Sequence, residues 1–403
     1  MLELLAPAGN IEKLNTAYYF GADAAYVGGK DFSLRAFADN FDRDELSSAV
    51  KKAHNLGKKI YVTANIFAKN ADFQALADYF RFLEAIKVDA VIISDAGVFS
   101  VCRKIAPDLP VHISTQANTL NKYSAEFWAK EGASRIILAR ELSLDEIKEI
   151  RDFIPDSVEL ESFCHGAMCI SYSGRCLLSD YFTGRHSNRG ECVQSCRWNY
   201  EIRERDKKGE FFTIEEDERG SYILNSKDLN MISHLDKMAR AGITSFKIEG
   251  RMKSEYYVAT VVNAYRRAID AYLKIGDKYN KNDLFYNELT KTNHRAFTTC
   301  FNLGANDSTV NYSDAQSAGD RTFVAVVKSY DKLTHIATVE MRNRFFEGDM
   351  LELLTPHDNL NAKIVVKNLC DESGNAVLDA RIVQQTLTFF TEEILHAGDI
   401  LRR

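Results

Sequence analysis

Four cysteines lie close together near the middle of this 403-residue chain. They are Cys169, Cys176, Cys192 and Cys196, spaced Cys-x6-Cys-x15-Cys-x3-Cys. Thiols at this density are typical of either a metal site or a pair of disulfides, and the redox state of the compartment decides between the two. The N-terminal residues lack the basic segment of a signal peptide, and no apolar run approaches the roughly 20 residues of a membrane span. We therefore predict a cytoplasmic protein, with no membrane partner, whose clustered cysteines bind a metal.

The spacing of the cysteines favours an iron–sulfur cluster over zinc. Iron–sulfur clusters are commonly held by four thiolates at varied spacings, whereas structural zinc sites usually show two tight Cys-x2–4-Cys pairs. Here only Cys192 and Cys196 form a tight pair. Zinc and unligated thiols remain as alternatives, and Cys164, five residues before Cys169, could replace one ligand.

A second group of charged residues lies on one short segment after the cysteines. Polar and apolar residues alternate in Ser245–Arg251, which places Lys247, Glu249 and Arg251 on one face of a strand. Two cations and a carboxylate on such a face suit an anionic substrate. The alternative is a salt-bridged barrel interior without a ligand.

Other polar residues stand at the ends of other predicted strands. Among them are Arg140, Glu161 and His165, and also Asn65, Asp95, Ser114 and Gln116. In a closed barrel the carboxyl ends of all strands face one mouth, so these side chains should gather there. We take Glu161, His165, Lys247 and Glu249 as candidate catalytic residues, and Arg140 and Arg251 as candidate substrate-binding residues.

Arginines and aromatic residues are interleaved around the cysteines. They are Arg175, Arg185, Arg189 and Arg197, with Tyr172, Tyr181, Phe182 and Trp198. This combination suits phosphate contact and stacking on unpaired bases, although arginines also offset the negative charge of a thiolate-bound cluster. The net charge of −6 excludes a generic nucleic-acid coat. We take Arg175 and Arg197 as candidate substrate-binding residues, together with Lys227 and Asp228 farther along the chain.

The elements that must position these residues repeat as short apolar strands and amphipathic helices. Eight strands are predicted over Leu2–Ala6, Ala24–Val27, Lys59–Thr63, Ala90–Ile93, Val111–Ser114, Arg135–Leu138, Glu159–Phe163 and Ser245–Ile248. Helical spacing predicts helices such as Arg43–Leu56, Ala71–Ala85 and Leu144–Phe153, and Gly21, Gly57, Gly132 and Gly242 end several helices. Eight βα units indicate a closed (β/α)8 TIM-like barrel of the α/β class. An open doubly wound sheet is the alternative, but Ala6–Asn10 does not match the Gly-x-Gly-x-x-Gly fingerprint that would favour it.

The predicted domain boundaries lie where the alternation of strands and helices ends. Residues 1–275 form the barrel, ending in a long helix over Ser254–Ile275, and residues 164–244 are an insertion that carries the cysteines. Within the insertion, Tyr200–Tyr222 resembles an acidic hairpin. Residues 276–318 connect the barrel to a small all-β barrel domain at 319–403. Its predicted strands are Phe323–Val327, Ile336–Val339, Asp349–Leu354, Ala362–Val366 and Asp399–Arg402.

Familiar hydrolase signatures are missing, since there is no His-Glu-x-x-His zinc motif and no Gly-x-Ser-x-Gly elbow. The chain nevertheless resembles peptidase family U-32, the collagenase-like proteins, over nearly its whole length. The resemblance is carried by Glu161-Ser-Phe-Cys-His-Gly-Ala-Met-Cys-Ile-Ser-Tyr-Ser-Gly-Arg-Cys-Leu-Leu-Ser179, and by Leu4–Gly9, Asn225–Leu229 and Lys247–Arg251. Cys192-Val-Gln-Ser-Cys-Arg-Trp198 is most similar to the branch of this family that modifies tRNA.

The resemblance implies a tRNA-modifying enzyme that hydroxylates the wobble uridine to 5-hydroxyuridine in a prephenate-dependent reaction. It also implies a 4Fe–4S cluster on the cysteines, with the tRNA anticodon region and a small carboxylated cosubstrate as partners. A homo-oligomer and a complex with a partner subunit are both compatible with the sequence. The alternative is a collagenase-like peptidase, which requires an activated nucleophile or an open metal site that the sequence does not clearly offer.

Overall fold

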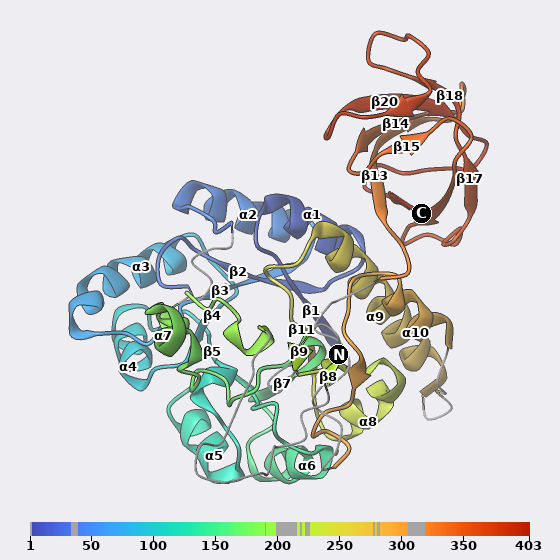
Figure 1. The fold of residues 1–403 in the computed structure, drawn as a ribbon. Helices are drawn as coiled ribbons and strands as arrows, with labels where there is room; N and C mark the ends of the chain where they lie inside the picture. Colours follow the sequence, from blue (N-terminus) through green and yellow to red (C-terminus); the bar gives the residue numbers. More distant parts are fainter. Residues whose placement is uncertain are drawn as a thin grey trace.

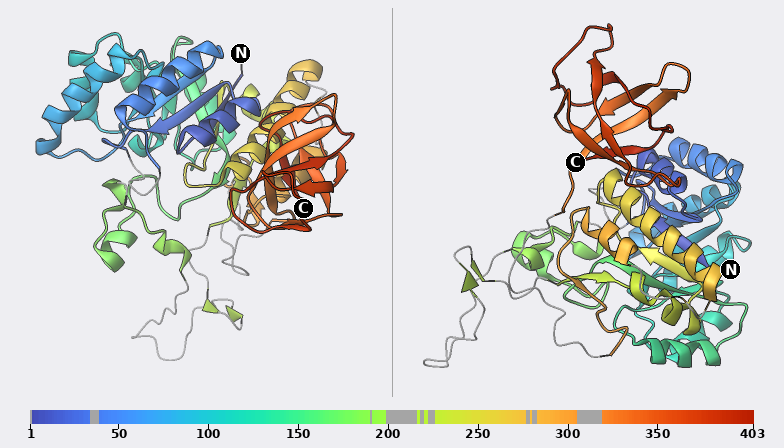
Figure 2. Two further views of the ribbon diagram at one scale, coloured as in Figure 1. Left: turned by 90° about the horizontal axis from the view of Figure 1, so that it is seen from above. Right: turned by 90° about the vertical axis from the view of Figure 1, so that its right-hand side faces the viewer.

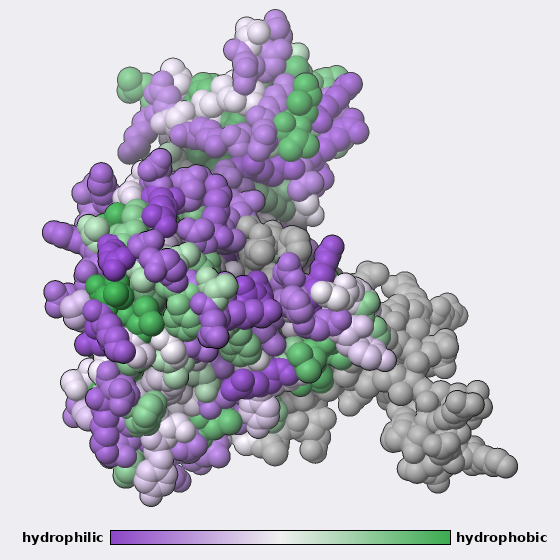
Figure 3. Space-filling view, turned by 90° about the vertical axis from the view of Figure 1, so that its left-hand side faces the viewer, coloured by the Kyte–Doolittle hydropathy of each residue, from purple (hydrophilic) through white to green (hydrophobic). Residues whose placement is uncertain are grey.

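The computed structural model describes residues 2–33, 39–189, 191–198, 216–217, 220–221, 226–276, 279, 283–304 and 319–403. They form a barrel with a smaller β domain beside it (Figures 1 and 2). No helix in the described part of the chain has both the length and the apolar character that a membrane crossing requires. On the face of the molecule shown in Figure 3, hydrophobic residues form small groups among hydrophilic ones.

Eight parallel strands close into the predicted (β/α)8 barrel (Figure 1). The strands are β1 (Glu3–Pro7), β2 (Ala24–Gly28), β3 (Lys59–Thr63), β4 (Ala90–Ile93), β5 (Val111–Ile113), β6 (Arg135–Ile137), β7 (Glu159–Ala167) and β11 (Ser245–Ile248). Each of the first seven pairs with the next one, and β11 pairs with both β7 and β1. This closure confirms the barrel and excludes the open sheet. Because both faces of these strands are covered, nearly every residue in them is buried.

Helices surround the barrel, including those predicted at Arg43–Leu56, Leu144–Phe153 and Ser254–Ile275, whereas the helix predicted over Ala71–Ala85 begins at Phe73. They are α1 (Ile11–Tyr19), α2 (Arg43–Asn55), α3 (Phe73–Ala85), α4 (Ala96–Ile105), α5 (Lys122–Lys130), α6 (Leu144–Phe153), α8 (Leu235–Arg240) and α9 (Glu255–Ile275), with short 3-10 turns η1 (Asn70–Asp72) and η2 (Thr115–Ala117). Polar caps set several starts: Ser143 and Glu146 form a capping box on α6, and the Ser254 side chain accepts from Tyr257 N at the start of α9. The four glycines predicted to end helices all have positive φ, a conformation that glycine adopts without strain.

The cysteine-bearing insertion leaves the barrel after β7 and stands away from one end of it (Figure 2). It contains α7 (Leu178–Thr183), η3 (Ser187–Arg189), η4 (Ser195–Arg197), β10 (Asp228–Asn230) and η5 (Ile232–His234). Strand β10 runs antiparallel to the extended end of β7, which ties the insertion back to the barrel. Of the predicted hairpin at Tyr200–Tyr222, β8 (Glu216–Asp217) and β9 (Gly220–Ser221) pair antiparallel. The rest of that stretch, and Asn225, lie outside the described residues.

The segment between the two domains contributes helix α10 (Asp283–Thr290) and strand β12 (Phe297–Thr298), which pairs with β10. Beyond it lies the predicted all-β domain, in which every pairing is antiparallel. Its strands are β13 (Phe323–Asp331), β14 (Ile336–Met341), β15 (Phe345–Phe346), β16 (Met350–Leu354), β17 (Lys363–Val365), β18 (Lys367–Cys370), β19 (Asp379–Ala380), β20 (Thr386–Phe390) and β21 (Ile400–Arg402). A buried ion pair joins this domain to the connecting segment, because Arg402 of β21 contacts Glu288 of α10 at 2.7 Å. Arg402 also contacts Glu352 of β16, within its own domain, at 2.9 Å.

Candidate active site at the mouth of the barrel

A cavity of about 180 Å³ opens at the carboxyl ends of the barrel strands, where barrel enzymes place their sites. Barrel residues form one side of it: Tyr26, Thr63, Asn65, Gln116, Arg140, Phe163, Lys247, Glu249 and Arg251 are among them. The insertion forms the facing wall with Cys169, Tyr172, Ser173, Cys176 and Cys192. The topology therefore brings four predicted charged residues and three predicted cysteines to one space. We call Arg140, Lys247, Glu249 and Arg251 the mouth residues.

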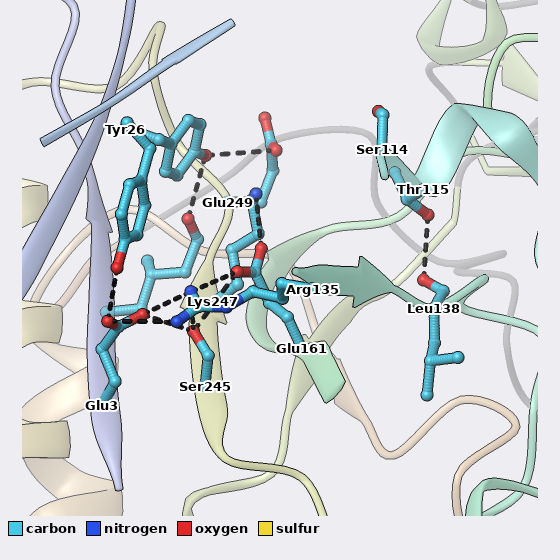
Figure 4. Close-up of polar contacts among 12 residues, drawn as sticks. Glu3, Tyr26, Ser114, Thr115, Arg135, Leu138, Glu161, Ser245, Lys247 and Glu249 are labelled. Atoms are coloured by element: carbon cyan, nitrogen blue, oxygen red, sulfur yellow. Dashed lines mark hydrogen bonds and ion pairs between the residues drawn. The ribbon is translucent and has the colours of Figure 1, made fainter. Parts of the chain in front are cut away.

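Lys247 reaches this cavity from β11, and its ammonium group also forms an ion pair with a carboxylate deeper in the barrel. Its Nζ lies 2.7 Å from Oε1 of Glu161, which is fully buried (Figure 4). The ammonium group also lies 4.4 Å from the centre of the Tyr26 ring, within the range of a cation–π interaction. Glu161 does not line the cavity. It can therefore act on a ligand only through Lys247.

Beneath this pair lies a dense network at the amino ends of the strands, which we call the barrel floor. Arg135 donates to Glu3 at 2.6 Å and to Glu161 at 3.0 Å (Figure 4). It also donates to Glu159 at 2.5 Å. Ser245 donates to Glu3 at 2.8 Å. Burial alone would raise the pKa of Glu3, but the charge of Arg135 and its hydrogen bonds more than offset burial and lower that pKa. A salt-bridged interior is the alternative interpretation of Lys247, Glu249 and Arg251, and of these Lys247 does form a buried ion pair, with Glu161.

Arg251 lies just past β11, where neutral oxygens fix its guanidinium. It donates to Ser33 Oγ at 2.8 Å, to Thr63 Oγ1 at 3.2 Å and to Asn40 Oδ1 at 2.7 Å. The absence of a side chain at Gly28 makes room for this group, since a Cβ there would lie 2.3 Å from Arg251 Nη2. These contacts hold a buried positive charge at the edge of the cavity.

Arg140 connects the barrel to the cysteine wall. Its guanidinium donates to the carbonyl oxygen of Ala167 at 3.1 Å and to Ser173 Oγ at 2.8 Å. Burial disfavours the charged guanidinium, but the charge and hydrogen bonding of Cys169 outweigh burial, so the pKa of Arg140 is raised. Arg140 therefore stays charged while it touches both the insertion and the cavity.

Glu249 is the one acidic residue among the mouth residues. Tyr26 OH lies 3.5 Å from its Oε2 and donates to Ile248 O at 3.0 Å (Figure 4). The backbone carbonyl of Glu249 accepts a hydrogen bond from Tyr257 OH at 2.9 Å. The side chain lines the cavity beside the cations, where a carboxylate can accept or release a proton.

His165 is not at the mouth, although strict alternation along β7 predicts it there. Lys247 pairs with Phe163 and Ile248 pairs with His165, so Cys164 is an extra residue that forms a bulge in β7. The side chain of His165 instead packs among Tyr257, Tyr265 and Phe297. Burial lowers its pKa to about 3. The structure therefore separates His165 from the other candidate catalytic residues.

Three predicted substrate-binding residues, Asp228, Lys227 and Arg175, also lie away from the cavity lining. Asp228 is buried on β10 and pairs with Arg295 at 2.6 Å, while Lys227 is half-buried beside it. Arg175 is exposed on the insertion, with its guanidinium 5.7 Å from the centre of the Phe67 ring. The backbone of Arg197 lies in η4, and its side chain is outside the described part of the structure.

The four cysteines are free thiols, and three of them face one space. Cys169, Cys176 and Cys192 line the cavity, whereas Cys196 lies in η4 outside its lining. Within the described residues, no three His, Cys, Asp or Glu side chains are grouped closely enough to hold a metal ion. The donor set itself suits an iron–sulfur cluster or zinc, because thiolates are soft ligands that both prefer. Cys169, Cys176 and Cys192, with Cys196 adjacent in the chain, are the residues that would hold such a group.

The cavity lining contains some residues that the sequence indicated and others that it did not. Asn65 and Gln116, noted as strand-end residues, hydrogen-bond to each other at 2.9 Å in the lining, whereas Asp95 caps α4. Tyr26 and Thr63 were missed because they sit inside buried apolar strands. Thr63 is the last residue of β3, so its place at a strand end is a usable signal, whereas Tyr26 lies in the middle of β2 and has no such signal.

A second cavity of about 580 Å³ lies between helices α1 and α2 and the C-terminal domain. Its lining includes Tyr19, Lys52 and Lys328. None of the predicted site residues contributes to it, so the chemistry-bearing residues single out the mouth cavity despite its smaller volume.

Comparisons with known proteins match both domains of this architecture. The profile of "Peptidase family U32" matches residues 9–311, and that of "Peptidase family U32 C-terminal domain" matches residues 320–402. The tRNA hydroxylation protein P1 of Bacillus subtilis (strain 168) is 40% identical over 407 residues, covering 100% of this chain and 94% of the relative. The tRNA hydroxylation protein P of Escherichia coli (strain K12) is 37% identical, covering 89% of this chain and 87% of the relative. The 23S rRNA 5-hydroxycytidine C2501 synthase of Escherichia coli (strain K12) is 35% identical, covering 76% of this chain and 47% of that protein.

Proposed function

Since the chain belongs to peptidase family U32, we propose that its function is the one most of its similar relatives are named for, hydroxylation of an RNA base. The finer proposal is that the base is the wobble uridine of tRNA, converted to 5-hydroxyuridine in a prephenate-dependent reaction. The relatives that cover nearly the whole chain support tRNA over rRNA, because both are named tRNA hydroxylation proteins.

One observation carries this proposal: the cysteine-bearing wall and the cationic mouth residues enclose the same cavity. A redox reaction on an anionic substrate requires both an electron-transfer centre and positive charge close to the reacting base. Cys169, Cys176, Cys192 and Cys196 would hold a 4Fe–4S cluster, and zinc is the alternative. Such a cluster, when bound, exchanges single electrons with a substrate.

The chain's own side chains have separate roles in this proposal. Arg140 and Arg251 bind the carboxylates of a small cosubstrate or an RNA phosphate, because guanidinium groups match both geometries. Lys247 carries a further positive charge, which Glu161 orients from below. Glu249 is placed to accept a proton from a group bound among these cations.

The alternative function, proteolysis, finds less support in the same cavity. A serine or cysteine nucleophile is usually activated by a nearby histidine. Among the described residues that line the cavity there is no histidine, and His165 packs behind β7 instead. A collagenase-like activity would therefore need a base that the described part of the site does not supply.

The proposal is tested by mass spectrometry of tRNA nucleosides. Deletion of the gene should remove 5-hydroxyuridine and its derivatives, and the parent gene should restore them. Cys176→Ala should fail to restore them, whereas the matched control Cys370→Ala should succeed, because Cys370 lies on β18 in the C-terminal domain. Unchanged tRNA in the deletion strain, together with metal-independent collagen cleavage by the pure protein, would favour the peptidase instead.

The cofactor is tested separately from the reaction. Protein purified without oxygen should be brown, absorb near roughly 400 nm and contain iron and sulfide, as expected for thiolate-bound clusters. Cys176→Ala should lose the colour and the iron. One zinc ion per protein chain, with no absorbance in that region, would instead show that the cysteines bind zinc.

A further inference from the structure

Exposed aromatic side chains gather on the insertion, next to the cavity. Tyr172, Tyr181, Phe182 and Trp198 are 48%, 83%, 44% and 42% exposed, and we call these four residues the aromatic platform. Single exposed aromatics are common on soluble proteins. Four within one short segment, beside a candidate active site, indicate a surface that binds something.

Contacts within the platform show that three of the rings form one surface. Tyr181 and Phe182 lie on α7 with ring centroids 5.1 Å apart. Trp198 follows η4, and its ring centroid is 6.2 Å from that of Phe182. The fourth ring, Tyr172, lines the cavity, and so does Cys176, which directly precedes the segment that leads into α7. The chain lines the cavity both before α7, at Tyr172 and Cys176, and after it, at Ser187 and Cys192, so α7 and its two rings lie on a segment anchored at the cavity.

The charge of this segment points to the kind of partner. The whole chain has a net charge of −6, but residues 169–198 contain four arginines (Arg175, Arg185, Arg189 and Arg197) and two acidic residues (Asp180 and Glu191). Arg189 pairs with Asp72 of the barrel at 3.0 Å, so it adds little to this surface. By composition the segment still has more arginines than acidic residues, and with its exposed aromatic rings it is complementary to a polyanion whose bases have exposed faces.

We propose that the aromatic platform binds single-stranded RNA by stacking on the unpaired nucleotides that flank the base held in the cavity. This inference rests on the proposed function, since it takes the cavity to hold an RNA base. Stacking on Tyr181 and Trp198 positions the strand, while the cavity selects the base that reacts. Double-stranded RNA is a poor partner, because its base faces are already stacked on one another. Because the platform stacks on neighbouring bases, recognition depends on several unpaired nucleotides of an RNA loop and not only on the base that reacts.

The experiment uses Trp198 as a built-in reporter. The chain has two tryptophans, and the other, Trp128, packs against Phe99 and Phe127 on the barrel wall. In a Trp128→Phe protein all tryptophan fluorescence comes from Trp198. A synthetic anticodon stem–loop RNA should quench this fluorescence, and a fully duplexed RNA of equal length should not. In the matched Trp198→Phe protein, the same stem–loop should leave the fluorescence of Trp128 unchanged.

Binding affinities of the stem–loop complete the test. Tyr181→Ala should weaken binding about tenfold, in line with the loss of one base–aromatic stack. The control is Tyr123→Ala, which removes a ring that is 65% exposed on α5 and should leave the affinity unchanged.

The outcomes separate this inference from the function on which it rests. If the parent protein binds no RNA, the proposed function fails. If the parent binds RNA, but Tyr181→Ala binds equally well and Trp198 is not quenched, only the platform fails. If Tyr181→Ala instead lowers the molecular mass measured by light scattering, the platform joins two copies of the chain and the RNA assignment is overturned.

Discussion

The floor and the mouth of the barrel are built from the same strands but use their charges differently. On the floor, Arg135 contacts three carboxylates, so its charge is paired within the protein. At the mouth, Arg251 hydrogen-bonds to hydroxyl and amide oxygens and Arg140 to a hydroxyl and a carbonyl oxygen, and both line a cavity. Lys247 links the two regions through Glu161. We therefore assign the charged residues at the carboxyl ends of the strands, and not those of the floor, to the proposed site.

The largest effect on stability is expected on the floor. Arg135→Met leaves Glu3 and Glu161 buried without their guanidinium partner, and breaking a buried pair in this way costs about 3–5 kcal/mol. Urea unfolding at neutral pH should show a correspondingly lower midpoint. The control is Arg175→Met, which removes an exposed arginine of the insertion and should change the stability by less than about 0.5 kcal/mol. Equal urea midpoints for the two variants would show that the floor network stabilises the protein no more than an exposed arginine does.

At the mouth, a substitution should lower the activity more than the stability. Arg251→Met removes a charged group that we assign to anion binding, and losing hydrogen bonds to a charged group costs about 1.5–3 kcal/mol, or about 10–100-fold in activity. Nucleoside mass spectrometry of tRNA from complemented cells should show this loss, with protein levels measured in parallel. Lys253→Met, two residues away and outside the cavity lining, should keep the parent's activity. Full modification by the Arg251 variant would remove Arg251 from the site.

Acid should destabilise the protein through His165. This residue belongs to β7, but its side chain is buried away from the mouth cavity. Burial lowers its pKa to about 3, with Asp228, His294 and Lys253 as the other contributors. Between about pH 6.5 and 3 the unfolded chain binds a proton that the folded chain does not, so stability falls as the pH falls, by roughly 1.4 kcal/mol per pH unit. The stability of His165→Leu should fall less steeply between neutral pH and pH 5. Parallel pH profiles from urea unfolding would contradict this assignment.

The smallest effect is expected from Gly28→Ala, which perturbs the mouth without removing any functional group. The added Cβ would lie 2.3 Å from Arg251 Nη2 and 2.4 Å from Ser33 Oγ, so the guanidinium must shift. A loss of about 1 kcal/mol of binding, or about fivefold in activity, is the expected result. Measuring KM for the RNA and for prephenate separately would show which of them Arg251 contacts. Unchanged values for both would mean that the position of Arg251 is not important.

The sequence predicts the barrel well because its signals are local. Strands β3, β4 and β11 begin and end where the apolar runs do, and α6 occupies the predicted range. Each of these elements is set by residue spacing and caps within about ten residues. The same signals place Lys247, Glu249 and Arg251 on one face, and all three line the cavity.

The features that local patterns do not predict depend on partners distant in sequence. His165 is turned away by a bulge whose only trace is the pairing of β7 with β11, eighty residues later in the chain. Asp228 looks like a free carboxylate in the sequence, but Arg295 neutralises it. Whether a charge is paired inside the fold or presented to a ligand is decided by tertiary contacts, which alternation and composition do not contain.

The central claim is that the target base enters the mouth cavity, and photo-crosslinking tests it most directly. An anticodon stem–loop RNA carrying 5-bromouridine at the wobble position places the photoreactive group on the carbon that would be hydroxylated. Irradiation of its complex with the full-length protein, followed by mass spectrometry of the peptides, identifies the residue in contact. The account predicts crosslinks to cavity residues such as Tyr26 and Tyr172. Crosslinks to the second cavity, at Tyr19 or nearby, with none at the mouth, would contradict it.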